Sequence, residues 1–379
     1  MFLVLGIVTA AWAPLVPDLK LRLSLDDAQL GLMLLCIGGG SLLAAPVTGL
    51  VVARVGCRAV MLGLGVLFCA ALPALTVMQG VPMTALTLAV FGATIAGIDV
   101  AMNIQAVAVE RAAERPMMSG FHGLFSLGGL FGASLVSVML ALGASALPAA
   151  LVLAGGGLVV LLSQAPWMMP RGMMPRGMTP RGMMAGAEGP RAVMALPHGR
   201  LVLIGGLCFI GFMAEGAVHD WTAVLLRFHR DAGPGTAGLA YAAFASAMTL
   251  GRLSGDAVLK RVAPVWVLSV GAALAAAGFL LMTAVPSVAA ALVGCALIGL
   301  GEANVVPALF SAAARDGRVD PSVAIAAVAS PGYVGLLAGP ALIGLAAQAT
   351  TLPIALGGAG LLLLLITATA RVAAREEPA

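Results

Sequence analysis

The pattern of hydrophobic and polar positions divides the chain into about twelve long apolar stretches, separated by short polar or charged gaps. Each stretch has about 20 residues, the length that a helix needs to cross the hydrocarbon core of a bilayer. Spanning segments must be helices or closed barrels because backbone polar groups find no water in lipid. A barrel would show alternating segments of about 10 residues, and the sequence has none. We therefore predict helices over residues 2–17, 29–52, 59–79, 83–108, 117–142, 147–165, 201–226, 237–258, 265–284, 288–312, 322–348 and 352–371.

Composition supports lipid as the main solvent. Hydrophobic residues make up 61% of the 379 positions and charged residues only 9%, whereas a soluble domain carries roughly 25% charged residues. The first stretch has neither a basic leading region nor a small-residue cleavage site, so we interpret it as a helix and not as a signal peptide. It is short and contains Pro14 and Pro17, which leaves open a start upstream of Met1.

The distribution of basic residues predicts the orientation. With the N-terminus in the cytoplasm, the inner loops and the C-terminal tail hold sixteen of the 20 Lys and Arg residues. The outer loops then hold only Lys20, Arg22, Arg227 and Arg230. An excess of this kind marks the cytoplasmic side. We expect a multi-pass protein of the bacterial inner membrane with both termini in the cytoplasm.

Residues 166–200 form the longest non-apolar segment and divide the chain in two. The motif Met-Pro-Arg-Gly-Met occurs at 169–173 and 174–178, and Thr-Pro-Arg-Gly-Met follows at 179–183. Repeated Pro and Gly predict a flexible linker. It could bind anionic headgroups, or it could be a tolerated low-complexity expansion, and we favour the second interpretation. The predicted domains are a six-helix bundle over 1–165, a cytoplasmic linker over 166–200 and a second six-helix bundle over 201–379.

The two halves share landmarks at one spacing. Gly49 and Gly251 are 202 positions apart, and so are Gly92 and Gly294. The second pair of glycines precedes an acid in each half, Asp99 and Glu302. Two matches at one spacing favour a duplicated six-helix unit, the parallel repeat of some secondary transporters.

One loop resembles the signature loop of the major facilitator superfamily. Residues 49–58 read Gly-x-x-x-Ala-Arg-x-Gly-x-Arg, with Ala53 where the family has Asp. Residues 251–256 look like the second copy, and Gly335-x-x-x-Gly339-Pro340 is similar to glycine-proline stretches of that family. The resemblance implies an all-α membrane protein with two pseudo-symmetric six-helix bundles. The residues that we expect to lock one transport state are Gly49, Arg54, Gly56, Arg58, Arg252 and Asp256.

A finer resemblance links the chain to poorly characterised bacterial inner-membrane permeases, distantly similar to fucose-permease-like carriers. The matching segments are Asp99-x-x-x-Asn103, Glu110-Arg111, residues 121–129, Glu215 with Asp220-Trp221, and residues 301–307.

Ionisable residues inside predicted helices are the candidates for chemistry. Such groups cost at least ~2.5–3.5 kcal/mol at the centre of a bilayer and usually face a cavity or a partner. Asp99 and Asn103 share a helix face, and so do Glu215 and His219. Each acid could bind solute or protons, or it could be bonded to a neighbouring helix for packing. The predicted solute or proton site is Asp99, Asn103, Glu215, Glu302, His122, His219 and Asn304.

Some of these residues have a second interpretation. His122 lies near the start of its predicted helix and could simply bond a neighbouring carbonyl group. His219 and Asp220 could lie at the outer headgroups with Trp221 as an interface anchor, and for Asp220 we favour a solvated or gating role.

Several classes of protein are disfavoured. The sequence has no nucleotide-binding loop, no HExxH and no GxSxG, so we expect neither an enzyme nor an ATP-driven pump, and no cofactor. The five cysteines are scattered, which argues against a metal site or disulfides.

The favoured function is a monomeric secondary active transporter that moves a small solute by alternating access, coupled to protons or working as a uniporter. Acids without a buried basic partner favour a cationic or neutral solute. The alternative is a membrane sensor or assembly protein that kept the carrier fold without transport, and nucleic acid is not an expected partner. The direction of transport stays open.

Overall fold

The computed structural model describes residues 1–114, 117–169, 199–255, 258, 261–316, 319 and 321–375. All regular structure in these ranges is helical. In the N-terminal part the elements are α1 (Phe2–Trp12), η1 (Ala13–Leu15), α2 (Val16–Arg22), α3 (Asp27–Val55), α4 (Cys57–Val77), α5 (Val81–Ala113), α6 (Met118–Ala141), α7 (Ala146–Gln164) and η2 (Ala165–Trp167). In the C-terminal part they are α9 (Gly199–His229), α10 (Pro234–Leu253), α12 (Pro264–Ala284), α13 (Val288–Glu302), α14 (Val305–Ala314), α15 (Pro321–Ala349) and α16 (Leu352–Ala373).

The prediction of about twelve membrane helices is confirmed. Among the described residues, eleven helical segments are long and apolar enough to cross a bilayer. The twelfth is α10, a 20-residue helix that is less apolar because it carries Arg252 together with several glycine and hydroxyl residues.

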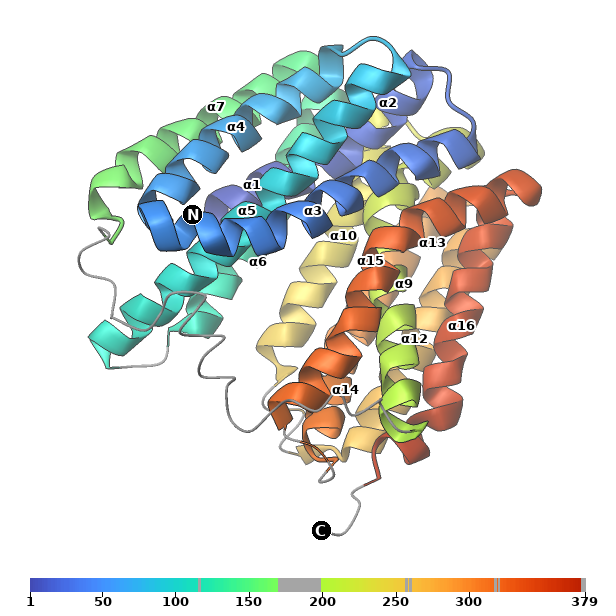
Figure 1. The fold of residues 1–379 in the computed structure, drawn as a ribbon. Helices are drawn as coiled ribbons and strands as arrows, with labels where there is room; N and C mark the ends of the chain where they lie inside the picture. The colour runs from blue at the N-terminus through green and yellow to red at the C-terminus, as the bar shows by residue number, and fades with distance from the viewer. Residues whose placement is uncertain are drawn as a thin grey trace. The chain divides into compact units, whose positions relative to one another are not determined.

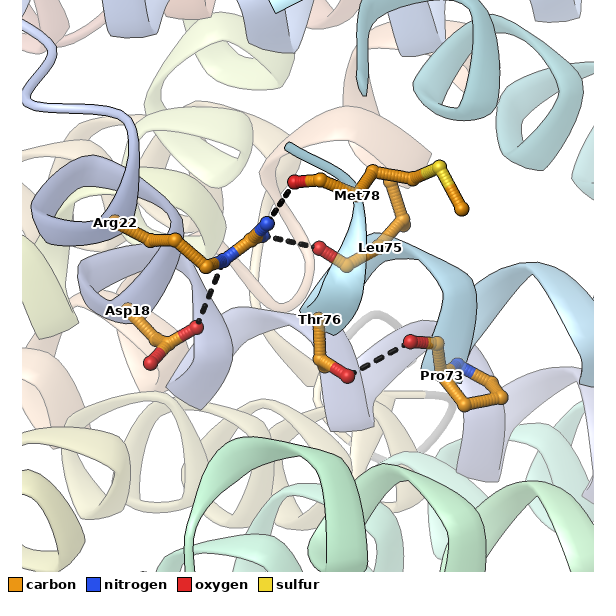
Figure 2. A network of polar contacts seen from close by, with 6 residues as sticks. All are labelled: Asp18, Arg22, Pro73, Leu75, Thr76 and Met78. Carbon is orange, nitrogen blue, oxygen red and sulfur yellow. Dashed lines mark hydrogen bonds and ion pairs between the residues drawn. The ribbon is translucent and has the colours of Figure 1, made fainter. Parts of the chain in front are cut away.

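The first helical segment is longer than predicted. It runs from Phe2 to Arg22 because Pro14 and Pro17 occupy first-turn positions of η1 and α2, where a missing N–H group costs nothing. Lys20 and Arg22, predicted in an outer loop, therefore lie within α2. Figure 2 shows how Arg22 is satisfied there: its guanidinium donates to the carbonyl groups of Leu75 and Met78 at the end of α4.

The helix predicted over 288–312 is broken. α13 ends at Glu302 and α14 begins at Val305, with Asn304 outside helical geometry at φ −117° and ψ 0°. Pro307 explains the position of the break, since proline has no N–H to donate and its ring crowds the carbonyl group four residues earlier. An ionisable residue thus lies beside non-helical backbone.

The chain divides into two compact units. Unit 1 contains residues 1–24 and 33–192, and unit 2 contains residues 25–32 and 193–379. Within unit 1, α1 packs along α6, and α4 lies beside both α5 and α7 (Figure 1). Within unit 2, α9 packs along α15, and α12 lies beside α13 and α16 (Figure 1). The predicted linker falls largely on residues 170–198, outside the described residues, so the predicted domain boundaries stay a prediction.

Glycines set the closest helix contacts in both units. In unit 1 a Cβ atom at Gly6 would collide with the Phe125 carbonyl oxygen, and one at Gly132 would collide with that of Ile7. In unit 2 a Cβ atom at Gly335 would collide with the Phe209 carbonyl oxygen. Small residues that let backbones approach are the usual means of helix association in lipid.

The two units use arginine in the same way. Arg22 ends the first helical segment of unit 1 and donates to carbonyl groups at the end of α4. Arg230 follows α9 in unit 2 and donates to the carbonyl oxygens of Met282 and Thr283, near the end of α12, at 3.3 and 2.7 Å. The last carbonyl groups of a helix lack intrahelical partners, and a cation there also favours the helix dipole. This correspondence supports the predicted duplication.

Candidate functional site

In unit 1 the structure brings three predicted residues together. Asn103 lies one turn after Asp99 on α5, and its Nδ2 donates to Asp99 Oδ1 at 3.1 Å and to the Asp99 carbonyl oxygen at 2.9 Å. His122, on α6, is close enough for its charge to act on Asp99. Asp99 and His122 are both exposed on unit 1, so protein does not cover them. The result is a carboxylate, an amide and an imidazole on one accessible patch.

Aromatic contacts fix the position of His122. Its ring meets the Phe2 ring edge to face, with centroids 5.2 Å apart. Phe2 also stacks on Phe121 at 5.5 Å, which ties the start of α1 to α6. Such aromatic pairs restrain a side chain without using its polar atoms. The imidazole nitrogens therefore stay available for protons or solute.

In unit 2 a predicted solute residue pairs with a predicted gating residue. Glu215 lies on α9 and Arg252 in the last turn of α10, and Oε1 of the glutamate is 3.6 Å from NH2 of the arginine. Their side chains are 29% and 45% exposed. Arg252 lies within the helix predicted over 237–258, although it was counted with the inner-loop cations, and the structure places it in the last turn of α10 beside the acid. Its gating role stays a prediction.

Among the candidate acids, Glu302 has the fewest hydrogen-bond and ion-pair partners within the described residues. It ends α13 at the break, only 3% of the residue is exposed, and its Oε1 has no hydrogen-bond partner within the described ranges. The charges of Glu215 and Arg252 both act on it. A buried carboxylate without partners is costly, so it either binds a proton or awaits a ligand.

Gly211 on α9 faces this carboxylate. A Cβ atom there would lie 3.3 Å from Val306 Cγ2 and 3.4 Å from Glu302 Oε2. Gly211 is one turn before Glu215 on α9, so Glu302 approaches the face of α9 that carries Glu215. The structure thus gathers Glu215, Arg252 and Glu302 from three helices of one unit.

The outer end of this cluster differs from the sequence interpretation. His219 Nδ1 lies 2.7 Å from Asp220 Oδ1, and its ring meets Tyr241 edge to face at 4.9 Å. Asp220 is 8% exposed and Trp221 is fully buried. The solvated role for Asp220 and the alternative of Trp221 as an interface anchor are therefore wrong, whereas a gating role for Asp220 stays a prediction. The reason is that α9 packs against α15, α16 and α10, so the half of the helix that carries these residues is also interior.

Asn304 has a backbone partner. Its Nδ2 donates to the carbonyl oxygen of Gly251 at 3.1 Å, which joins the break after α13 to the last turn of α10. A Cβ atom at Gly251 would collide with Ala303, so the two segments can meet only at a glycine. The role of Asn304 in solute binding stays a prediction, and its Nδ2 already donates one hydrogen bond to Gly251.

The signature loop has a clear backbone requirement. Gly56 is the N-cap of α4 at φ +87°, a conformation that other residues adopt only with strain. Gly49 and Arg54 lie on α3, and Arg58 lies in the first turn of α4. Neither arginine has an ion pair with a carboxylate in the described part of the chain, as expected where Ala53 replaces the family's acid. Asp256 lies outside the described residues.

Two polar residues that contact these helices or site residues, Arg200 and Tyr241, were not predicted from the sequence. Arg200 starts α9 and donates to Asp316 Oδ1 at 3.2 Å and to the carbonyl oxygens of Ala312 and Ala373 at 3.2 and 2.9 Å. The sequence placed it in the linker. Tyr241, one of only two tyrosines, contacts His219 and was not singled out, although a rare phenol in an apolar helix is itself a signal. Within the described ranges, no three His, Cys, Asp or Glu residues are grouped to hold a metal ion.

A helical membrane protein with accessible or buried ionisable groups on its spanning helices, and a broken helix beside one of them, has the make-up of a secondary transporter. The chain belongs to the Major Facilitator Superfamily, whose family model matches residues 1–320. This membership confirms the predicted fold class and the prediction that the protein is not an enzyme.

Relatives and solved structures agree with the family. An uncharacterized MFS-type transporter of Yersinia pestis is 45% identical over 377 residues, covering 99% of this chain and 94% of that protein. The membrane protein MosC of Rhizobium meliloti is 31% identical over 351 residues, covering 93% of this chain and 83% of MosC. The crystal structure of a mutant of the nucleoside transporter NupG is 11% identical with a TM-score of 0.75 and covers 99% of both chains, a likeness of fold alone.

Proposed function

We propose that the protein is a proton-coupled secondary transporter that moves a small solute across the bacterial inner membrane by alternating access, with both termini in the cytoplasm. Membership of the Major Facilitator Superfamily supports transport of a small solute. The excess of basic residues on one set of loops supports the orientation. In this proposal Glu302 carries the proton, and the patch of Asp99, Asn103 and His122 contacts the solute.

The observation that carries the proposal is the state of the Glu302 carboxyl group. It is 3% exposed, and its Oε1 lacks a partner among the described residues. By contrast, Glu215 has Arg252 at 3.6 Å, and Asp99 has the amide of Asn103 at 3.1 Å. Burial favours the neutral form of a carboxyl group that has no compensating charge. A change that brings Glu302 to water or to a cation would release the proton, and such differential binding is what coupling requires.

The position of Glu302 suits this role. It lies at the break between α13 and α14. The regular helical hydrogen bonds are already interrupted there, so the backbone can change direction without breaking more of them. Discontinuous helices form ion and substrate sites in many secondary transporters. Arg252, whose charge already acts on Glu302, would be the natural partner after deprotonation.

The surroundings of Asp99 favour a cationic or neutral solute, the class that the sequence also favoured. Asp99 is exposed on unit 1, and its partners among the described residues are a neutral amide and a histidine whose charge acts on it. A cationic or neutral polar solute could therefore bind there. The finer resemblance to fucose-permease-like carriers stays a prediction, so the solute panel includes fucose and other sugars beside nucleosides, amines and carboxylates.

The test is solute uptake by proteoliposomes that contain a pH-sensitive dye. A transported solute is first found by exchange of labelled for unlabelled solute, which needs no net proton movement. For Glu302→Gln, whose amide mimics the protonated acid, we expect exchange to continue while proton-driven accumulation and the dye signal are lost.

Glu110→Gln is the matched control. Glu110 accepts hydrogen bonds from the backbone N–H groups of Met117 and Met118 at 2.7 and 2.8 Å, so it has a structural role at the start of α6. We expect that variant to keep both exchange and accumulation. Full accumulation by Glu302→Gln would refute the proton role, and failure of exchange across the whole panel in folded wild-type protein would favour the non-transporting sensor.

A further inference from the structure

A cavity of about 530 Å³ lies between the start of α12 and the end of α16, within unit 2. Its lining is Val265, Trp266, Ser269, Thr367, Ala368 and Arg371. None of these residues belongs to the candidate transport site. The lining combines a guanidinium, two hydroxyl groups and an indole with apolar side chains, whereas the partly exposed polar residues elsewhere on the two helices are only Thr283 and Thr369.

The polar groups of the cavity gather at one end of the two helices. Arg371 lies in the last turn of α16 and Trp266 in the first turn of α12. Thr367 Oγ1 donates to the Ser269 carbonyl oxygen at 3.1 Å and so holds the helices together beneath them. Trp266 is 61% exposed, in contrast to the fully buried Trp12 and Trp221. An exposed tryptophan at the end of a spanning helix is typical of the membrane interface.

Among the described residues, no carboxylate compensates the charge of the cavity. Arg371 has no ion pair in the described part of the chain, and neither α12 nor α16 contains an Asp or a Glu. Asp316, the acid near the end of α14, is already paired with Arg200 at 3.2 Å. The next acids in the sequence, Glu376 and Glu377, lie outside the described residues. The cavity therefore presents the Arg371 cation together with the Ser269 hydroxyl group, since the Thr367 hydroxyl already donates to the Ser269 carbonyl oxygen.

An apolar track continues from the cavity along both helices. Leu361 and Leu365 precede Ala368 by seven and three residues, so they lie on its face of α16, and they are 52% and 49% exposed. Val270 on α12 lies one turn after Trp266, hence on the same face, and is 58% exposed. Apolar residues so exposed need a hydrocarbon partner in a spanning helix.

We propose that this cavity binds the headgroup of an anionic phospholipid, with its phosphate on Arg371 and its acyl chains along the exposed leucines and valine. The cationic end of the cavity matches the phosphate, the interfacial tryptophan matches the region between headgroup and acyl chains, and the apolar track matches the acyl chains. Basic pockets between helices at the cytoplasmic face are a known type of site for anionic headgroups. This end of α12 and α16 is the one that we propose to be cytoplasmic, but binding itself does not depend on that orientation.

Trp266 makes the proposal testable by fluorescence quenching with brominated lipids. The purified full-length chain, carrying Trp167→Phe, is reconstituted into phosphatidylcholine vesicles. Trp167 is removed because it is 84% exposed, whereas Trp12 and Trp221 are buried. A small fraction of brominated phosphatidylglycerol or of brominated phosphatidylcholine is then added. We expect the anionic lipid to associate with Trp266 about fivefold more strongly, the gain that one basic residue near the surface provides.

Three further variants localise the effect. Arg371→Gln should reduce the preference to about one, and Arg371→Lys should keep it. Arg111→Gln is the matched control because Arg111 is also an exposed arginine in the last turn of a spanning helix, and it should leave the lipid preference unchanged. Equal quenching by both lipids in the parent, a preference that survives Arg371→Gln, or no quenching by either lipid, as when a second copy covers the cavity, would each overturn the proposal.

Discussion

The buried pair of Arg200 and Asp316 gives the sharpest stability prediction. Its side chains are 8% and 0% exposed, and the arginine also donates to the carbonyl oxygens of Ala312 and Ala373. One guanidinium therefore joins the start of α9 to the ends of α14 and α16. Asp316→Ala would leave a buried cation without its anion, which costs about 3–5 kcal/mol.

That magnitude converts into a large thermal shift. For a unit of this size, each kcal/mol lowers the unfolding midpoint by roughly 2–4 °C. We therefore expect Asp316→Ala to lower the apparent Tm by about 6–20 °C, measured in one detergent by intrinsic fluorescence. Asp18→Ala is the comparison, because its pair with Arg22 at 3.6 Å is partly exposed at 45% and 21%. Exposed pairs contribute about 0–1 kcal/mol, so its shift should stay below about 4 °C.

A double substitution separates charge from packing. Arg200→Met with Asp316→Leu removes both charges together, and apolar replacements of a buried pair are often neutral or stabilising. We expect the double variant to recover much of the Tm that Asp316→Ala loses. If the two single variants, Asp316→Ala and Asp18→Ala, shift Tm equally, the pair of Arg200 and Asp316 does not hold these helix ends together as argued.

Four other variants test the backbone arguments, by apparent Tm or, for Gly132→Leu, by the yield of monodisperse protein. Gly56→Ala should cost about 1–2 kcal/mol because φ is +87° there, and an unchanged Tm would show that the loop relaxes freely. Gly132→Leu should prevent a folded, monodisperse product because even its Cβ atom would collide with the Ile7 carbonyl oxygen, whereas Gly39→Ala faces open space and should be neutral. Arg230→Gln should lower Tm by several degrees, since two carbonyl groups at the end of α12 lose their donor.

The positions of the helices could be predicted because lipid leaves the backbone no alternative. Any apolar stretch of sufficient length must be helical there, whatever its side chains prefer. The break after Glu302 was not predicted, although Pro307 carried the signal. Proline is tolerated inside α3, α4 and α15, so its presence alone does not mark a break. What differs at Asn304 is a tertiary contact, the hydrogen bond to Gly251, and the sequence does not display it.

The candidate site was predicted residue by residue but not as a set of contacts. Asp99 with Asn103 followed from helical spacing, because both lie on one helix. The pair of Glu215 and Arg252 joins two helices, and no local pattern reports which helices are neighbours. The same limit explains Trp221: a tryptophan near a helix end suits an interface or a core equally well until the packing of α9 is known.

The harder question in lipid is which face of a helix lies inside. In water an apolar stripe marks the buried face, but here both the lipid and the interior are apolar, so the stripe vanishes. Gly39 and Gly40 show the consequence: they are adjacent in sequence, yet one faces open space and the other meets the backbone of Ala89. Polar residues that have found partners are the better guide, because the bilayer cannot satisfy them. By that criterion Glu215, Asn304 and Arg200 mark the interior of unit 2, whereas Arg371, uncompensated at a helix end beside an exposed tryptophan, marks a face where the lipid itself can be the partner.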